Sequence, residues 1–342
     1  MTILVTGGTG HIGNVLIREL AASGKTVRAL VLPGEDRSIL DGVPVEWVEG
    51  NVLNPESLVF AFAGVDTVYH LAGIISIMPG HNPMMRRVNV EGTKNVLAAA
   101  QAGGVRKLVY TSSIHAFQHA PHGVVVDEAL PFDPDHAMGA YDCSKAEASL
   151  AVLKAAREGL DAVIVAPTGV IGPQDFRTSE MGALIRSWIK PSPSFLIDGR
   201  YDFVDVRDVV KGEMLAAEKG RRGEVYILSG EQIHLVQMMC LVKQALNLPV
   251  RVLTIPLRWA KFFFIFAVMY YRMSRERPRF TPYSIETVRC NSVISHAKAE
   301  RELGYHPRAL ALSLQETADW WKQYLFKRKT SPVAVNHDSP AS

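Results

Sequence analysis

Cysteine is scarce in this sequence: 342 residues contain only Cys143, Cys240 and Cys290. They are far apart, and none has the spacing of a metal site or of a disulfide framework. A chain without disulfides suits a reducing compartment, so we expect a cytoplasmic protein. The histidines are scattered as well, with no helical pair beside a third ligand, so we expect no metal site.

A strong charge of one sign is also missing. Lysine and arginine number 37 against 34 acidic residues, which leaves a net charge of +3. No basic stripe is interleaved with aromatic residues, so we expect no nucleic-acid partner. A G-x-S-x-G elbow is absent, which excludes the usual pattern of a serine hydrolase.

A long hydrophobic run is absent too. The most apolar stretch, residues 262–271, has ten residues, whereas a helix needs about 20 to span a bilayer. It is hydrophobic on every side, and basic residues follow it at positions 272, 275, 277 and 279. Two hypotheses remain: the stretch roofs an apolar pocket, which we favour, or it touches a membrane surface. Residues 1–6 are uncharged and do not resemble a signal peptide.

What is present is an alternation of strand and helix patterns. Hydrophobic residues make up 48 % of the chain, enough for a sizeable core. This pattern predicts an α/β fold, a Rossmann-type doubly wound parallel sheet with helices on both faces. The expected strands are residues 3–6, 27–32, 45–49, 67–71, 107–111 and 162–165, and the expected helices are residues 12–22, 88–102 and 141–158, with another helix beginning at Asn54-Pro55.

A glycine-rich segment joins the first expected strand to the first expected helix. It reads Thr6-Gly7-Gly8-Thr9-Gly10-His11-Ile12-Gly13. Glycines at such a junction let the backbone approach a pyrophosphate, and the helix N-terminus offers free N–H groups and the positive end of its dipole. The segment predicts a dinucleotide site, with Gly7, Thr9, Gly10, His11, Ile12 and Gly13 as contacts.

The second strand should carry the residue that distinguishes NAD from NADP. An acid there favours NAD and an arginine favours NADP. The strand ends Leu30-Val31-Leu32, which has neither, and Glu35, Asp36 and Arg37 lie just beyond. Because Arg37 could meet a 2′-phosphate, the sequence leans to NADP, with NAD as the alternative.

Tyr141 and Lys145 lie four residues apart at the start of a long expected helix, which places them on one face. An ammonium near a phenol lowers the pKa of the phenol, so Tyr141 is a candidate general acid or base. The preceding strand ends in Thr111, Ser112 and Ser113, at the sheet edge where ligands bind. Ser113 is therefore the candidate that holds a substrate oxygen, whereas Ser112 is interpreted as a capping serine. His115 and His119 are interpreted as loop residues.

Beyond residue 167 the pattern changes, because proline and glycine become frequent and short mixed elements follow. We expect residues 1–170 to form the NAD(P)-binding Rossmann domain, with a return to its sheet near residues 203–229. Residues 171–202 and 230–326 would form a smaller, mostly C-terminal substrate-binding region. The polar tail, residues 327–342, is expected to be disordered.

Taken together, these motifs resemble the extended short-chain dehydrogenase/reductase family, the NAD-dependent epimerase/dehydratase group. The resemblance covers about residues 1–325. Besides the glycine segment, the strand end at Thr111 and Tyr141-x-x-x-Lys145, its landmarks are Tyr69-His70-Leu71-Ala72-Gly73, Asn89-Val-Glu-Gly92-Thr93-Lys-Asn95, Pro167-Thr168-Gly169-Val170-x-Gly172-Pro173 and Phe203-Val-Asp-Val-Arg207-Asp208-Val209.

The resemblance implies a role for each site residue. Ser113 would hold the substrate oxygen, Tyr141 would exchange its proton, and Lys145 would bind the nicotinamide ribose. The family usually has Asp at the Asn51 position, a departure that weakens the adenine contact. The other residues implied to contact the dinucleotide are Val52, Leu71, Ala72, Gly73, Thr111, Pro167, Thr168, Gly169 and Val170.

Within the family the chain most resembles dihydroflavonol-reductase-like and 3β-hydroxysteroid-dehydrogenase-like proteins. The loop after Gly73 is apolar, with Ile74, Ile75, Ile77 and Met78, and favours a hydrophobic substrate. We therefore expect a reductase or dehydrogenase acting on a hydrophobic ketone or secondary alcohol, and a homodimer that pairs through residues 88–102 and 141–158. The alternatives are a nucleotide-sugar epimerase or dehydratase and a non-catalytic NAD(P)-binding regulator.

Overall fold

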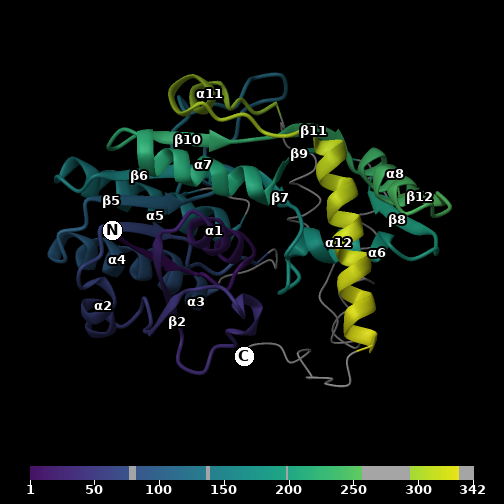
Figure 1. The fold of residues 1–342 in the computed structure, drawn as a ribbon. Helices are drawn as coiled ribbons and strands as arrows, with labels where there is room; N and C mark the ends of the chain where they lie inside the picture. The colour runs from purple at the N-terminus through teal and green to yellow at the C-terminus, as the bar shows by residue number, and fades with distance from the viewer. Residues whose placement is uncertain (77–81, 136–138, 198, 256–292, 331–342) are drawn as a thin grey trace.

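The computed structural model describes residues 1–76, 82–135, 139–197, 199–255 and 293–330 (Figure 1). Several sequence predictions fall outside these ranges. They concern the apolar stretch at residues 262–271, the arginines that follow it, Ile77, Met78, Cys290 and the tail beyond residue 330.

A seven-stranded sheet forms the centre of the molecule, in the order β10-β6-β5-β4-β1-β2-β3 (Figure 1). All neighbouring pairs are parallel, as the alternation of strand and helix patterns predicts. The strands are β1 (Thr2–Thr6), β2 (Thr26–Val31), β3 (Glu46–Glu49), β4 (Thr67–His70), β5 (Lys107–Thr111), β6 (Ala162–Pro167) and β10 (Val225–Leu228).

Helices cover both faces of this sheet, which confirms the doubly wound α/β fold. Successive side chains of strand β1 point to opposite faces of the sheet. Ile3 and Val5 pack into a hydrophobic core on one face, which we call the first, and Leu4 packs into the core on the second face. The first face carries α1 (His11–Ala22), α7 (Val206–Lys219) and α11 (Ala297–Leu303), and the second carries α2 (Pro55–Phe62), α4 (Gly92–Ala102) and α5 (Ala140–Arg157).

Two expected helices show local detail, one predicted by the sequence pattern and one missed by it. Asn54 caps α2 by accepting a hydrogen bond from the Glu56 amide, as the Asn-Pro pair predicts. The helix expected at residues 88–102 begins earlier, as α3 (Pro83–Arg86), and passes through a π-helical turn, η2 (Arg87–Glu91), before α4. Such wider turns often occur at functional sites, and this one carries the buried Asn89.

A smaller part of the chain lies beyond the carboxyl ends of the strands. Two small sheets build it, β11-β9-β7 and β12-β8. The helix α12 (Leu310–Thr330) stands in front of them (Figure 1). The remaining elements are β7 (Gly169–Ile171), β8 (Ser194–Ile197), β9 (Arg200–Asp205), β11 (Glu231–His234), β12 (Val252–Ile255), α6 (Glu180–Trp188) and α8 (Leu235–Ala245), with the 3₁₀ turns η1 (Ser38–Leu40) and η3 (Ile114–Ala116).

The C-terminal helix corrects one boundary. The tail was expected to begin at residue 327, but α12 continues to Thr330. Lysine and arginine are good helix formers, so polar composition alone did not end the helix.

Candidate active site

The strand order reverses between β1 and β4. In open α/β sheets, ligands bind at the carboxyl edge beside such a reversal, and we call this place the crevice. The loops that follow the two strands meet there. The backbone carbonyl of Thr6 accepts from the Leu71 amide at 3.2 Å, and the Thr6 hydroxyl accepts from the Ala72 amide at 3.1 Å. A Cβ on Gly7 would lie 2.7 Å from the Ala72 nitrogen, so only glycine permits this approach.

The glycine segment has the geometry of an anion cradle. Gly7 has φ +71°, and its carbonyl accepts from the Gly10 amide at 3.0 Å. Gly10 caps α1 without any side-chain hydrogen bond, which leaves the first amides of the helix available. A Cβ on Gly13 would lie 2.2 Å from the Gly7 carbonyl oxygen, so Gly13 lets the helix pack onto the loop. The residues present therefore fit a dinucleotide pyrophosphate.

An acid occupies the far end of this cradle. Glu35 accepts from the Thr9 hydroxyl, from the Leu32 amide at 2.9 Å, and from Arg177 at 3.0 Å. The sequence places Glu35 just beyond the second expected strand but does not assign it to the site. An acid at that position was the sequence feature that could have indicated its role.

Arg37, by contrast, is engaged away from the cradle. Its guanidinium pairs with Glu49 on β3 and lies over the Trp47 ring, 5.6 Å from the ring centre. These contacts place Arg37 against β3 in this structure.

Asn51 and Val52 follow β3 at the same edge of the sheet. The Asn51 side-chain oxygen accepts from the Leu53 amide at 2.9 Å, a bond that an aspartate could make equally well. Val52 is buried against Gly92, where a Cβ would lie 2.7 Å from a Val52 methyl group. The departure from Asp at position 51 therefore leaves this turn intact.

A segment from the second half of the chain crosses to the start of α1. The His11 Nε2 lies 3.0 Å from the Pro173 carbonyl and so carries the proton of this bond. The Asn14 amide donates to the Gln174 carbonyl at 3.2 Å. With the Arg177–Glu35 ion pair, these bonds hold residues 173–177 along one side of the cradle.

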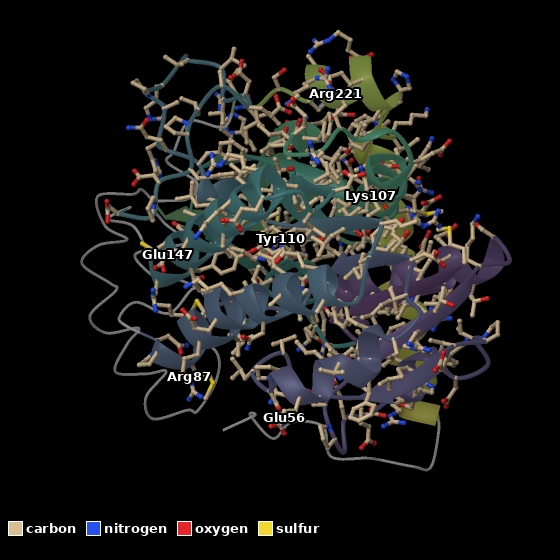
Figure 2. The ribbon with its side chains drawn as sticks, turned by 90° about the vertical axis from the view of Figure 1, so that its left-hand side faces the viewer. Glu56, Arg87, Lys107, Tyr110, Glu147 and Arg221 are labelled. Carbon is tan, nitrogen blue, oxygen red and sulfur yellow. The ribbon has the colours of Figure 1, made fainter. Side chains whose placement is uncertain are left out.

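Ser113, Tyr141 and Lys145 come together at the end of β5, and all three are buried. The Ser113 side chain acts on the Tyr141 hydroxyl and lowers its pKa, and the Ser113 oxygen accepts from the His115 amide at 3.2 Å. The Lys145 ammonium donates to the Thr111 carbonyl at 2.7 Å and lies over the Tyr110 ring. Figure 2 shows Tyr110 in the interior of the molecule.

The pKa of Tyr141 shifts in the direction opposite to the sequence prediction. Burial raises the pKa of Tyr141 above its usual range, the Ser113 hydrogen bond opposes the shift, and Asp142 adds to it. The predicted lowering by Lys145 is wrong for this structure, because the ammonium is turned to the Thr111 carbonyl. Burial also lowers the pKa of Lys145 to about 8, against a smaller opposing effect of Glu213.

The loop after β4 is held beside Lys145. The Asn89 side-chain oxygen accepts from the Ile74 amide at 2.7 Å, and its amide group donates to the Ile74 carbonyl and to Ser144. A Cβ on Gly73 would lie 3.7 Å from the Lys145 nitrogen. The predicted contacts Leu71, Ala72 and Gly73 therefore border both the cradle and the candidate catalytic set.

The segment Pro167, Thr168, Gly169 and Val170 forms the third side of the crevice. Thr168 donates to Asp202 at 2.6 Å, and the Phe203 ring packs against Gly169. Burial raises the pKa of Asp202 to about 6, although the bonds from Thr168 and the Gly230 amide oppose it. His115 lies in the turn η3, and its ring nitrogen lies 2.8 Å from the Tyr201 hydroxyl.

The family model described as "NAD dependent epimerase/dehydratase family" matches residues 3–229. The chain belongs to this family. Sterol demethylase protein B of Methylococcus capsulatus is 34 % identical and covers 94 % of this chain and 99 % of its own. The 3β-hydroxysteroid dehydrogenase/Δ5→4-isomerase of Mycobacterium tuberculosis is 29 % identical, over 89 % and 86 %. The crystal structure of gox2253 has a TM-score of 0.83 at 31 % identity and covers 94 % and 98 %.

This membership makes the chain an NAD(P)-dependent oxidoreductase of the extended short-chain dehydrogenase/reductase type. More distant epimerase/dehydratase family structures, such as UDP-glucose 4-epimerase from Thermotoga maritima at 22 % identity and a TM-score of 0.77, share the fold. Among the residues described, no helix is both long and apolar enough to cross a membrane.

Proposed function

We propose that this chain transfers a hydride between a nicotinamide and a hydrophobic ketone or secondary alcohol. The observation that carries the proposal is the buried Tyr141–Ser113 pair beside Lys145 at the crevice. A regulator that only binds the cofactor has no need of such a buried acid–base group, so this geometry favours catalysis.

Each side chain has a step in this mechanism. The nicotinamide, when bound, supplies or accepts the hydride. Ser113 donates a hydrogen bond to the substrate oxygen, and Tyr141 gives that oxygen a proton in reduction or removes it in oxidation. The Lys145 ammonium, fixed by the Thr111 carbonyl, would hold the nicotinamide ribose.

The described part of the loop after β4 supports an apolar substrate. Ile74 and Ile75 follow Gly73, and Ile75 is 66 % exposed. A nucleotide-sugar epimerase or dehydratase must hold a diphosphate, and Ile74, Ile75 and Ser76 supply no cation for it. The names of the sterol demethylase and hydroxysteroid dehydrogenase relatives also fit a sterol-like substrate.

A substrate panel tests this choice. The purified chain is incubated with either nicotinamide cofactor and with sterols, aryl ketones or UDP-sugars, and thermal shift and nicotinamide absorbance are recorded. We expect stabilisation and turnover with an apolar ketone or alcohol. Stabilisation by UDP-sugars alone would favour the epimerase or dehydratase alternative.

For the cofactor we propose NAD, which reverses the lean of the sequence toward NADP. The Glu35 carboxylate beside Thr9 suits the 2′-hydroxyl of an adenosine ribose and repels a 2′-phosphate. Fluorescence titration should give tighter binding of NADH than of NADPH, and Glu35→Gln should narrow the difference about tenfold, the scale of one lost charge interaction. Tighter NADPH binding by the unmodified chain would contradict this proposal and restore the role of Arg37.

A further inference from the structure

A buried carboxylic acid lies behind the candidate catalytic set. Glu213 is on α7, on the helix face that Val206, Val209 and Val210 turn to the sheet, and none of its surface is exposed. Residue 213 lies on the same helix face as these three valines, and side chains on the core-facing side of a helix are normally apolar. Burying a carboxylic acid at such a position costs folding free energy unless a hydrogen bond or an opposite charge compensates for the lost hydration.

Its hydrogen bonding is incomplete. The Glu213 Oε1 accepts from the Thr111 hydroxyl at 2.7 Å. The Oε2 has no hydrogen-bond partner among the described residues, and no ion pair to Glu213 is found among them. Nothing in this arrangement explains Glu213 as a structural anchor for α7.

Thr111 links Glu213 to the site. Its hydroxyl donates to Glu213, and its backbone carbonyl accepts from the Lys145 ammonium at 2.7 Å. Helix α7 lies on one face of the sheet and α5 on the other, so Glu213 and Lys145 approach the end of β5 from opposite sides. One residue therefore joins the acid to the lysine.

The two groups become opposite charges in a poorly solvated region once Glu213 ionises, which happens in the pH range where Lys145 loses its proton. Burial raises the pKa of Glu213 to about 8, an effect that Thr111 and Lys145 oppose. Tyr69 from β4 and Lys145 from α5 are the titratable groups that interact with it. The neighbouring strands β6, β9 and β10 contribute apolar side chains to this core, namely Val163, Val165, Val204 and Leu228.

We propose that Glu213 is a positioning residue for the hydride-transfer reaction, fixing Thr111 and acting as the counter-charge that keeps Lys145 an ammonium. The inference rests on the proposed roles of Tyr141 and Lys145. Without the carboxylate, Lys145 loses its proton at a lower pH, because nothing else among its described neighbours offers a negative charge on the far side of β5.

The test is the variant Glu213→Gln, which preserves shape and the acceptor for Thr111 but removes the charge. Turnover and NADH binding, the latter by fluorescence titration, are measured from pH 6 to pH 10. We expect the alkaline limb of both profiles to move to lower pH by about one unit, the size of a Coulomb interaction across a protein interior. At the low-pH plateau the variant should match the unmodified chain.

Two companions make the result decisive. Glu218→Gln makes the same change on the exposed side of α7 and should leave both profiles unchanged. Glu213→Met removes the charge and the hydrogen bond, and should show the same limb shift with weaker NADH binding at every pH. The inference would be overturned if the alkaline limbs of the turnover and NADH-binding profiles stayed in place in both Glu213 variants. It would also be overturned if Glu213→Gln lowered turnover equally at all pH values. Full turnover in Lys145→Met would instead overturn the proposed function.

Discussion

Burial sets the charge of the side chains around the crevice. It lowers the pKa of His70 to about 3, with Lys145 adding to the effect, so His70 is neutral. Its ring bonds Thr6 at 2.7 Å and Thr93 at 2.9 Å and thereby ties β4 to β1 and α4. The same desolvation raises the pKa of Tyr141 and so favours its protonated form. A protonated Tyr141 suits the donation of a proton to a ketone.

The phenol hydroxyl of Tyr141 can be tested directly. Tyr141→Phe should lower kcat by a factor on the order of 10² or more, because the general acid–base group is lost. NADH binding should persist, since Lys145 and the glycine cradle remain. Turnover is followed by nicotinamide absorbance, and binding by fluorescence.

The matched control is Tyr305→Phe. Tyr305 is also buried, but its hydroxyl donates to the Ser229 carbonyl and not to a member of the candidate set. This change should cost about 1 kcal/mol of stability and leave kcat unchanged. Equal kcat values for the two variants would refute the assignment of Tyr141.

At the scale of the element, the strand–loop–helix unit of residues 2–22 assigns different tasks to its glycines. Gly13 serves packing, because a Cβ there would overlap the Gly7 carbonyl. Gly10 has an ordinary φ of −72°, and a Cβ there would lie 3.3 Å from the same carbonyl. The chain itself can accept alanine at position 10 if the Gly7 carbonyl gives by a few tenths of an ångström, whereas a bound pyrophosphate at the loop would meet the added methyl group directly.

Two alanine substitutions separate these tasks. Gly10→Ala should weaken NADH binding at least tenfold while changing the free energy of unfolding by less than about 1 kcal/mol. Gly13→Ala should lose both NADH binding and several kcal/mol of stability, because backbone must shift. Denaturant melts and fluorescence titration supply the two measurements. Unchanged NADH affinity in Gly10→Ala would contradict the position of the pyrophosphate.

At the scale of the whole molecule, the two faces of the central sheet differ. The first face is covered by α1, α7 and α11. Two ion pairs, Arg308–Asp208 and Arg207–Glu316, join residues 305–330 to α7. On the second face, α5 keeps an exposed side where Leu150 is 39 % accessible. Figure 2 shows Glu147 of the same helix near the edge of the molecule.

We expect this side of α4 and α5 to pair two copies into a homodimer. Light scattering at micromolar concentration should give twice the chain mass of 37.6 kDa. Leu150→Glu should shift the mass toward the monomer, because a charge would be desolvated at the interface. Phe60→Glu, on the exposed side of α2, should remain dimeric. A monomeric unmodified chain would contradict the expectation.

The sequence by itself determined the main sheet and the candidate catalytic set. Apolar runs of strand length, helix caps such as Asn54 and the spacing from Tyr141 to Lys145 are local features, and local steric and hydrogen-bonding rules act on them wherever they occur. Ser113 was found for a related reason, because its place at the end of a strand brings it to the edge where parallel strands present their ligands.

Only the tertiary structure decided which charges meet. Glu35 and Arg37 are two residues apart in sequence, yet one lies at the cradle and the other pairs with Glu49, because β3 lies beside β2. Glu213 reaches the end of β5 from a helix 102 positions further along the chain. Such contacts depend on how distant elements pack, and the pKa shifts that follow depend on burial, which no local pattern contains.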